Sequence, residues 1–312
     1  MTRGLVVAVL LTAGSAYADD PKFEYGKHDD VKDIKDVEWT AAAEGGLVLT
    51  TGNSETISAS GGFKASRKSG DNKLALEASG TYSKSGVRVL DDKNGNGMID
   101  DPSEIKTVET VTSETLASKL RYDRFLTDFN SLFIAALAAR DVPAGKESVF
   151  GGQLGYSRQL WKTKTAETVA EIGYDFSRED LVTGDPIAIH SVRGFIGHKA
   201  IMTEGALLDA SVEALTNLNR ETLPTGKDGG AFKDTRVNMK IALQAKIGGN
   251  LAVQTSFEAH FDNRPGPLGI KPLAMGFVPE ASQVDTMMKA TLIYTFVTAK
   301  PPPKKPDACD KK

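Results

Sequence analysis

The sequence has little of what defines several common protein classes. A single cysteine among 312 residues excludes an internal disulfide framework and a cysteine-rich metal site. The net charge of −3 provides no basic footprint for nucleic acid. After the first twenty residues, the longest apolar run extends only from Leu132 to Ala139, whereas a membrane-spanning helix needs about 18 or more apolar residues. With 25% charged and 40% hydrophobic residues, the composition is nevertheless that of a folded chain.

The first residues have the pattern of an export signal. Arg3 gives a positive start, residues 5–13 are apolar, and an Ala-Tyr-Ala cleavage site ends at Ala18. The apolar stretch is too short for a membrane anchor and lacks a stop-transfer pattern. We therefore expect residues 1–18 to be a cleaved signal peptide and residues 19–38 to be a polar leader.

From Trp39 onward, apolar and polar residues alternate with a period of two, which places successive side chains on opposite faces of a strand. In one clear case, Val237 and Met239 alternate with Asn238 and Lys240. No segment has a convincing helical period. The pattern predicts twelve strands, at residues 39–51, 55–67, 73–85, 112–125, 131–141, 149–161, 167–179, 190–201, 205–219, 231–247, 251–262 and 284–297.

The connections between these strands alternate in length. Residues 69–71 and 248–250 belong to a set of short connections, and residues 86–111 and 263–283 belong to a set that is mostly long. Residues 51–54 are the exception, because they form a short connection within the long set. Barrels of the bacterial outer membrane combine an even number of strands with short periplasmic turns and longer external loops.

We therefore expect residues 39–297 to form an all-β, antiparallel transmembrane barrel of about twelve strands in a bacterial outer membrane. With both termini in the periplasm, every short turn lies on the periplasmic side. The apolar faces would then contact outer-membrane lipid and the polar faces would line the lumen. A secreted soluble β-protein is the alternative fold, because a sandwich also alternates, although it does not require one set of loops to be shorter.

The end of the chain suggests two partners. The last predicted strand ends with an aromatic, Phe296, and this resembles the signal that the barrel-assembly machinery reads. Residues 298–312 form a Pro/Lys-rich tail that contains Cys309. Proline-rich sequence favours an extended spacer. The tail is interpreted either as a disordered end or as a periplasmic tether to the cell wall or to a partner.

Short motifs suggest a family. Residues 46–55, Gly-Leu-Val-Leu-Thr-Thr-Gly-Asn-Ser-Glu, resemble the first hairpin of the DUF481 family, the salt-induced outer membrane proteins. Residues 152–156 and 171–175 are similar to mid-domain strands of that family, and the resemblance covers residues 39–296. It implies a barrel in a Gram-negative outer membrane, with no settled activity and no catalytic residues. The Gly-Asn pair also suits a hairpin tip on physical grounds, because both residues tolerate positive φ.

The longest early loop has the spacing of a calcium-binding loop. Asp92, Asn94 and Asn96 fall at positions 1, 3 and 5, and Gly97 falls at position 6, where the turn is sharp. No helical pattern flanks the loop, so it is typical of an isolated calcium loop rather than an EF-hand. The alternative is a flexible, acidic, glycine-rich loop. The expected calcium ligands are Asp92, Asn94, Asn96, Met98 through its carbonyl, Asp100 and Glu104, the last of which lies one residue beyond the usual terminal position.

No catalytic motif is found in the sequence. The four histidines do not pair at i and i+4, and the chain has neither a P-loop nor a Gly-x-Ser-x-Gly elbow. We expect no enzymatic activity and no cofactor besides calcium. An outer-membrane lipid hydrolase on a twelve-stranded barrel is an alternative, because the members of a catalytic triad need not be adjacent in sequence.

The predicted inner faces carry charges of both signs. Such a lining suits a hydrated lumen, and pore charges tune ion selectivity. Barrels of this strand number lie between those filled by side chains and the open sixteen-stranded porins. The function is therefore expected to be that of a narrow, porin-like channel or of an envelope-integrity or stress-related protein. The expected luminal residues are Lys119, Arg121, Asp123, Glu171, Asp175, Arg236, Lys240, Glu258 and His260.

The calcium loop can be tested by proteolysis. In the parent protein, calcium should protect residues 88–110 from protease, because ligation orders the loop. The Asp92→Ala variant should lose this protection. Equal digestion of the parent with and without calcium would contradict the interpretation.

Overall fold

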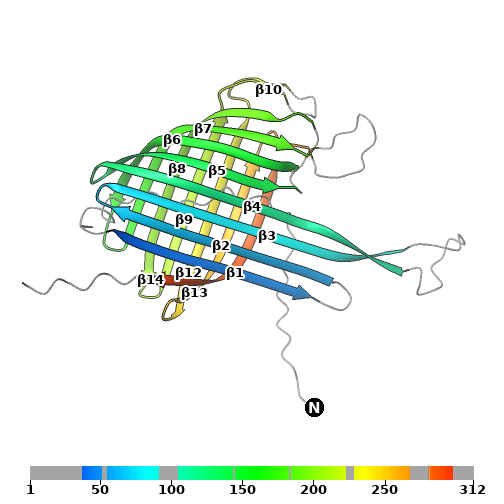
Figure 1. Ribbon diagram of the computed structural model, residues 1–312, viewed down its shortest axis with the longest axis horizontal. Helices are drawn as coiled ribbons and strands as arrows, with labels where there is room; N and C mark the ends of the chain where they lie inside the picture. Colours follow the sequence, from blue (N-terminus) through cyan, green and yellow to red (C-terminus); the bar gives the residue numbers. More distant parts are fainter. Residues whose placement is uncertain are drawn as a thin grey trace, which may run out of the picture.

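The computed structural model describes residues 37–50, 55–90, 105–142, 145–182, 184–222, 228–267, 280 and 282–297. Most of these residues form a closed antiparallel barrel of twelve strands (Figure 1). The predicted signal peptide, nearly all of the leader and the tail lie outside this part of the chain. The barrel strands are β1 (Glu38–Thr50), β2 (Glu55–Ser69), β3 (Asn72–Leu90), β4 (Ile105–Thr127), β5 (Asn130–Asp141), β6 (Lys146–Lys162), β7 (Ala166–Leu181), β8 (Ile187–Thr203), β9 (Ala206–Asn217), β12 (Thr235–Gly248), β13 (Leu251–Asp262) and β14 (Val284–Val297).

The strands pair in chain order, and β1 closes the barrel against β14. This closing seam is the shortest ladder, with six residue pairs from Thr40↔Val297 to Gly45↔Leu292, whereas every other ladder of the barrel has at least eleven. Two further strands of two residues each, β10 (Glu221–Thr222) and β11 (Asp228–Gly229), pair with one another inside the connection from β9 to β12. The sequence did not predict this small sheet.

The two ends of the barrel differ in their connections. Five tight turns lie at one end, which we call the turn end, and Gly70 and Gly249 in two of them have a φ of +52° that favours glycine. β1 begins and β14 ends at this same end. The other end, which we call the loop end, carries the longer connections. The predicted division into short and long connections is confirmed.

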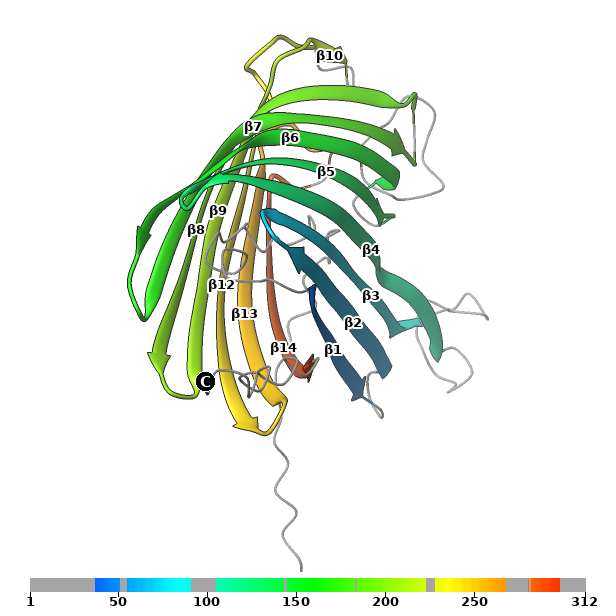
Figure 2. The same cartoon turned by 60° about the vertical axis from the view of Figure 1, so that its left-hand side comes forward.

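The predicted strand bounds differ most for β3 and β4. The two strands continue as a paired hairpin to Leu90↔Ile105, past the ends of their neighbours (Figures 1 and 2). Residues 106–111 are exposed on both faces, so neither face needs apolar side chains and the alternation that revealed the other strands fades there. Residues 231–234, predicted as the start of a strand, instead form a turn in which Phe232 has a φ of 61°.

The barrel is apolar outside and polar inside, the reverse of a soluble domain. Leu76, Leu120 and Ile134 are exposed on the outer face, whereas Lys119 and Arg121 are buried on the inner face. Exposed aromatic side chains gather near the turn end: Trp39, Phe129, Trp161 and Phe296. Within the ranges described, no helix is long and apolar enough to cross a membrane.

Gly155 on β6 allows a close approach inside the barrel. A Cβ atom at this position would lie 2.7 Å from Cζ of Phe133 on β5 and 2.6 Å from the backbone oxygen of Ile172 on β7. Phe133 is itself buried, so its ring occupies the space that a side chain at position 155 would need. The glycine is therefore required by the packing of the inner wall.

Gly155→Ala should lower the free energy of unfolding by about 1–3 kcal/mol, because the wall must shift to accept one methyl group. The measurement is urea-induced unfolding of the barrel refolded in lipid vesicles, followed by tryptophan fluorescence. Gly194→Ala is the matched control, because a Cβ atom there would meet no atom within 4 Å. Equal unfolding midpoints for the two variants would show that Phe133 does not depend on Gly155.

Candidate functional site: a charged layer across the lumen

Charged side chains fill the inner face where the strands cross the middle of the barrel. On β4, Lys119, Arg121 and Asp123 are 2%, 1% and 0% exposed, while the intervening Leu120 and Tyr122 point outward. Such low exposure means that these charges are not bathed by solvent in the lumen. Each must be neutralised by other luminal side chains.

Two arginines form the ion pairs that neutralise the buried carboxylates, and the carboxylates neutralise the arginines. Nη2 of Arg121 lies 2.7 Å from Oδ1 of Asp123 and 2.8 Å from Oε1 of Glu171 on β7. The other oxygen of Glu171, Oε2, lies 2.8 Å from Nη1 of Arg193 on β8. Nε of Arg193 in turn lies 2.5 Å from Oε1 of Glu213 on β9. These contacts link β4 to β9. We call the set formed by Arg121, Asp123, Glu171, Arg193 and Glu213, together with Lys119, which interacts electrostatically with Glu171 and Glu213, the ion-pair layer.

Aromatic rings hold the two guanidinium groups in place. The guanidinium carbon of Arg121 lies 4.0 Å from the ring centroid of Phe133, and that of Arg193 lies 5.2 Å from the centroid of Phe195. Cations at such distances are attracted to the ring face. Arg121 can reach β7 because it passes over β5, where Phe133 lies against Gly155 of β6.

Neutral side chains extend the layer in both directions. Nζ of Lys119 donates to Oε1 of Gln153 at 2.7 Å, and Nε2 of Gln153 donates to Oδ1 of Asp175 at 2.7 Å. On the other side, Nδ2 of Asn238 donates to Glu213 at 3.2 Å, and Oδ1 of Asn238 lies 2.9 Å from Nδ1 of His260. The hydrogen-bonded chain therefore extends from β4 to β13.

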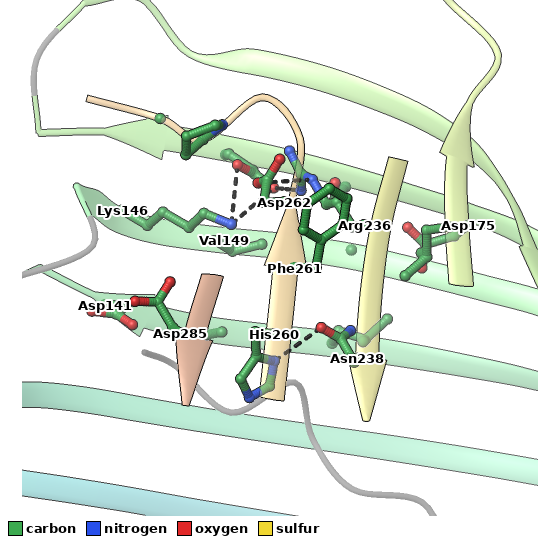
Figure 3. A pocket seen from close by; sticks show the side chains of 18 of the residues that line it. Asp141, Lys146, Val149, Asp175, Arg236, Asn238, His260, Phe261, Asp262 and Asp285 are labelled. Carbon is green, nitrogen blue, oxygen red and sulfur yellow. Dashed lines mark hydrogen bonds and ion pairs between the residues drawn. The ribbon is translucent and has the colours of Figure 1, made fainter. Parts of the chain in front are cut away.

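A cavity of about 140 Å³, the loop-end chamber, lies on the loop-end side of the layer. Figure 3 shows part of its lining, with Lys146 and Arg236 among the labelled side chains. Its wall includes Gln153 and Asp175, which belong to the hydrogen-bonded chain. Five carboxylates and two cations line it: Asp141, Asp175, Glu179, Asp262, Asp285, Lys146 and Arg236. Nη1 of Arg236 lies 2.5 Å from Oε1 of Glu179, and Nζ of Lys146 lies 3.4 Å from its Oε2.

A second cavity, of about 380 Å³, lies toward the turn end, and we call it the turn-end chamber. It lies between the wall formed by β1, β2 and β3 and the wall formed by β8, β9, β12, β13 and β14. Its charged lining consists of four lysines and three carboxylates: Lys64, Lys68, Lys199, Lys240, Glu44, Glu77 and Asp209. Nζ of Lys199 lies 3.6 Å from Oδ2 of Asp209.

The structure distributes the expected luminal residues among these three regions. Lys119, Arg121, Asp123 and Glu171 lie in the ion-pair layer. Asp175, Arg236 and His260 line the loop-end chamber, and Lys240 lines the turn-end chamber. Glu258 is buried on β13, with Oε2 3.7 Å from Nζ of Lys289.

The sequence reasoning missed two members of the layer, Arg193 and Glu213. Arg193 lies on β8, where Phe195 also points inward, so the inner face did not stand out as polar. The outward positions of Val192 and Ile196 were the usable signal, because they place Arg193 on the inner face.

The expected calcium ligands, from Asp92 to Glu104, lie outside the described residues. Among the residues that the structure does describe, no group of three or more His, Cys, Asp or Glu side chains is arranged to hold a metal ion.

At the loop end, Asn217 anchors the connection from β9 to β12. Its side chain donates to the carbonyl oxygens of Asn219 and Gly230 and accepts from the backbone N–H groups of Lys233 and Asp234. Asn217 is only 1% exposed. One side chain therefore fixes both ends of a long connection above the barrel wall.

Two buried carboxyl groups of this connection, Glu221 and Asp234, share a hydrogen bond. Arg264 lies 3.5 Å from Glu221, and Arg236 lies 3.4 Å from Asp234. Burial, the hydrogen bond to Asp234 and its charge together raise the pKa of Glu221 to about 8. Burial also raises the pKa of Asp234. The pair therefore retains a proton at neutral pH.

This pair should make the docking of the connection depend on pH. A carboxyl group whose pKa is raised by docking favours the docked state at low pH, and this contribution is lost as the pH rises from the ordinary value of 4.5 toward about 8. Hydrogen exchange of residues 218–222 and 228–234 should therefore accelerate more steeply than the intrinsic rate does between about pH 4.5 and about pH 8, and should follow the intrinsic rate above about pH 8. Glu221→Gln should abolish the additional acceleration, and an unchanged pH profile in that variant would exclude the pair as its cause.

Comparison with known proteins places the chain in a family. The family model described as "Protein of unknown function, DUF481" matches residues 43–296. A comparison with curated protein sequences finds no match.

Several solved barrels are similar in structure. The NanC porin is 10% identical with a TM-score of 0.44, over 82% of this chain and 98% of that one. The translocator domain of the autotransporter NalP from Neisseria meningitidis is 13% identical with a TM-score of 0.41, over 86% and 91%. The CymD monoaromatic hydrocarbon channel is 10% identical with a TM-score of 0.35, over 85% and 88%. Similarity at this level carries no conclusion about activity. The family match covers most of the chain, and the protein therefore belongs to the DUF481 family of proteins of unknown function.

Proposed function

We propose that the protein is a bacterial outer-membrane barrel that acts as a narrow channel for small charged solutes. Its exposed apolar outer face and the aromatic side chains near the turn end suit a lipid environment. The short connections then face the periplasm and the long connections face the cell exterior, as in other outer-membrane barrels.

The observation that carries the proposal is the position of the ion-pair layer between two chambers. A solute that moves between the chambers along the inner faces of β4, β7 and β8 passes Arg121, Glu171 and Arg193. Rings of charged side chains at a constriction select ions by sign and size. The layer contains three basic side chains and three carboxylates, so a solute meets groups of both signs at a narrow barrier.

A closed barrel with a role in envelope integrity or stress response is the second candidate. It is favoured by the near-zero exposure of Arg121 and Arg193, which leaves little room for water at the layer. Removing one partner of a buried ion pair destabilises proteins by about 3–5 kcal/mol, so a layer of this kind also serves to hold the barrel shut.

The proposal also covers the partners of the barrel, the calcium loop and the absence of catalysis. The last strand, β14, would be recognised by the barrel-assembly machinery, and lipid would be the main partner of the outer face. Calcium would order the loop that contains Asp92, and the barrel would have no catalytic activity. Ester hydrolysis by the purified barrel, lost on a single serine or histidine substitution, would contradict the last point.

Single-channel recording in a planar bilayer tests the channel directly. The parent should give small, discrete current steps. The double variant Arg193→Gln/Glu213→Gln removes one cation and one carboxylate together, so the net charge of the layer is unchanged, and Glu171 keeps its pair with Arg121. This variant should raise the conductance by roughly twofold or more, because the barrier loosens.

Gln254→Ala is the control, because Gln254 lines the turn-end chamber but lies outside the layer. Its conductance should equal that of the parent. No current from a parent that still shows heat-modifiable gel migration would overturn the channel and favour the closed barrel. Equal conductance in the parent and the double variant would place the ion path away from the layer.

A further inference from the structure

The seam between β1 and β14 is paired over only part of its length. The ladder between the two strands ends at Gly45↔Leu292, although β1 continues to Thr50 and β14 begins at Val284. On their other sides both strands stay paired to these residues, β1 with β2 and β14 with β13. The barrel wall is therefore continuous everywhere in the described strands except along the loop-end half of this seam.

We call residues 46–50 of β1 and 284–291 of β14 the open edges. The two strands run away from one another beyond the end of their ladder (Figures 1 and 2). Gly46 still lies close to β14, since a Cβ atom there would lie 3.5 Å from the backbone oxygen of Ala290. Within the described ranges, no strand pairs with either open edge on the side of the seam. Such edges present rows of backbone N–H and C=O groups.

The open edges lie within the apolar band of the outer face. Leu47 and Leu49 on β1 and Met288 on β14 are exposed and point outward. The neighbouring strands continue the band, because Leu49 pairs with Ile57 on β2 and Met288 pairs with Phe257 on β13, and both partners are exposed. In a membrane, the space between the open edges is therefore at the depth of the lipid.

The inner side of the same place is polar. Asp285 of β14 lines the loop-end chamber, and Lys289 of the same strand places Nζ 3.7 Å from Oε2 of the buried Glu258. The edge of β14 thus has the chamber on one side and lipid on the other. At membrane depth, backbone groups outside a ladder are tolerated only where they are buried in protein or line a water-filled cavity.

We propose that the open edges frame a lateral opening, which connects the loop-end chamber with the outer leaflet of the bilayer and passes amphipathic molecules. The inference rests on the proposed place of the barrel in an outer membrane. It adds a second route and a second class of solute to the proposed channel, because a molecule that leaves through the wall does not cross the ion-pair layer.

The class of solute follows from the two sides of the opening. An acyl chain alone leaves the backbone groups of the edges without hydrogen bonds, and an ion alone pays a large desolvation cost on entering lipid. A molecule with a polar group and an apolar body meets both conditions at once. Its polar group stays hydrated beside the chamber, while its body passes between Leu49 and Met288. Because Asp285 and Lys289 are of opposite sign, the inner rim does not restrict the polar group to one charge.

Disulfide formation tests whether the seam stays open in a bilayer. The variants carry Cys309→Ser, which removes the single native cysteine. Leu49 and Met288 would face one another if the ladder kept its register, so Leu49→Cys/Met288→Cys is the open-edge pair. Ala43→Cys/Tyr294→Cys is the seam pair, because these residues are ladder partners. A disulfide requires Cα atoms within about 7 Å. After refolding in lipid vesicles, the seam pair should therefore oxidise, and the open-edge pair should not.

Entry of anilinonaphthalene sulfonate tests the passage, because this probe has an anionic group and an apolar ring system and fluoresces in lipid. The protein is placed in vesicles with an outer leaflet of lipopolysaccharide, which the probe enters slowly. The parent should accelerate entry over protein-free vesicles. Benzophenone maleimide attached to Leu49→Cys should abolish the acceleration, because it fills the opening. The same group on Ile134→Cys of β5 should preserve it, since Ile134 is 60% exposed and Leu49 is 62% exposed, but Ile134 lies away from the seam.

The outcomes separate the lateral opening from the channel. Oxidation of the open-edge pair to the extent of the seam pair would show that the seam closes, and a disulfide-linked dimer would show that a second copy covers the edges. Either result would overturn the opening, and so would failure of the seam pair, since the strands would then not pair as described. A folded parent that does not accelerate entry, or acceleration that survives labelling at Leu49→Cys, would overturn the passage. Single-channel conductance should be unchanged by that label, so a parent without current would overturn only the channel.

Discussion

Two guanidinium groups are buried inside this barrel, and the need to neutralise them organises the lumen. Arg121 and Arg193 share the carboxylate of Glu171, so strands that are not neighbours in the sheet are joined across its inner face. The aromatic rings beneath the arginines and the glycine beneath Phe133 make this arrangement sterically feasible. The two chambers lie on either side because the layer occupies the middle.

The same constraint explains why, in the described part of the barrel, buried charges rather than apolar side chains fill the inner face at the layer. An apolar filling would need mainly inward aliphatic side chains, but the strands place most of their large aliphatic side chains outward, toward lipid. A wide aqueous pore would leave the inner charges hydrated and mobile. Twelve strands bring the walls near enough for long side chains to meet, and arginine suits this geometry because its planar group binds two carboxylates at once.

The strands could be predicted from the sequence because one face of each meets a different environment from the other. β13 and β14 were predicted with the bounds that the structure shows, since apolar and polar residues alternate over their whole length. The β3–β4 hairpin was underestimated because both of its faces are exposed, and the β10–β11 sheet was missed because two-residue strands have no periodicity. For the site, alternation could assign Arg121 and Glu171 to the inner face. It could not show that they meet, because that contact depends on strand register and on the space above Gly155.

The seam between β1 and β14 gives the barrel an uneven resistance to opening. Its six residue pairs are about half of what the shortest of the other ladders provides. It also joins the first and last strands of the barrel, so it closes the longest loop of any ladder, and closing a longer loop costs more conformational entropy. Any force that unrolls the barrel into a sheet, whether heat or lateral tension in the bilayer, meets its weakest mechanical element at this seam.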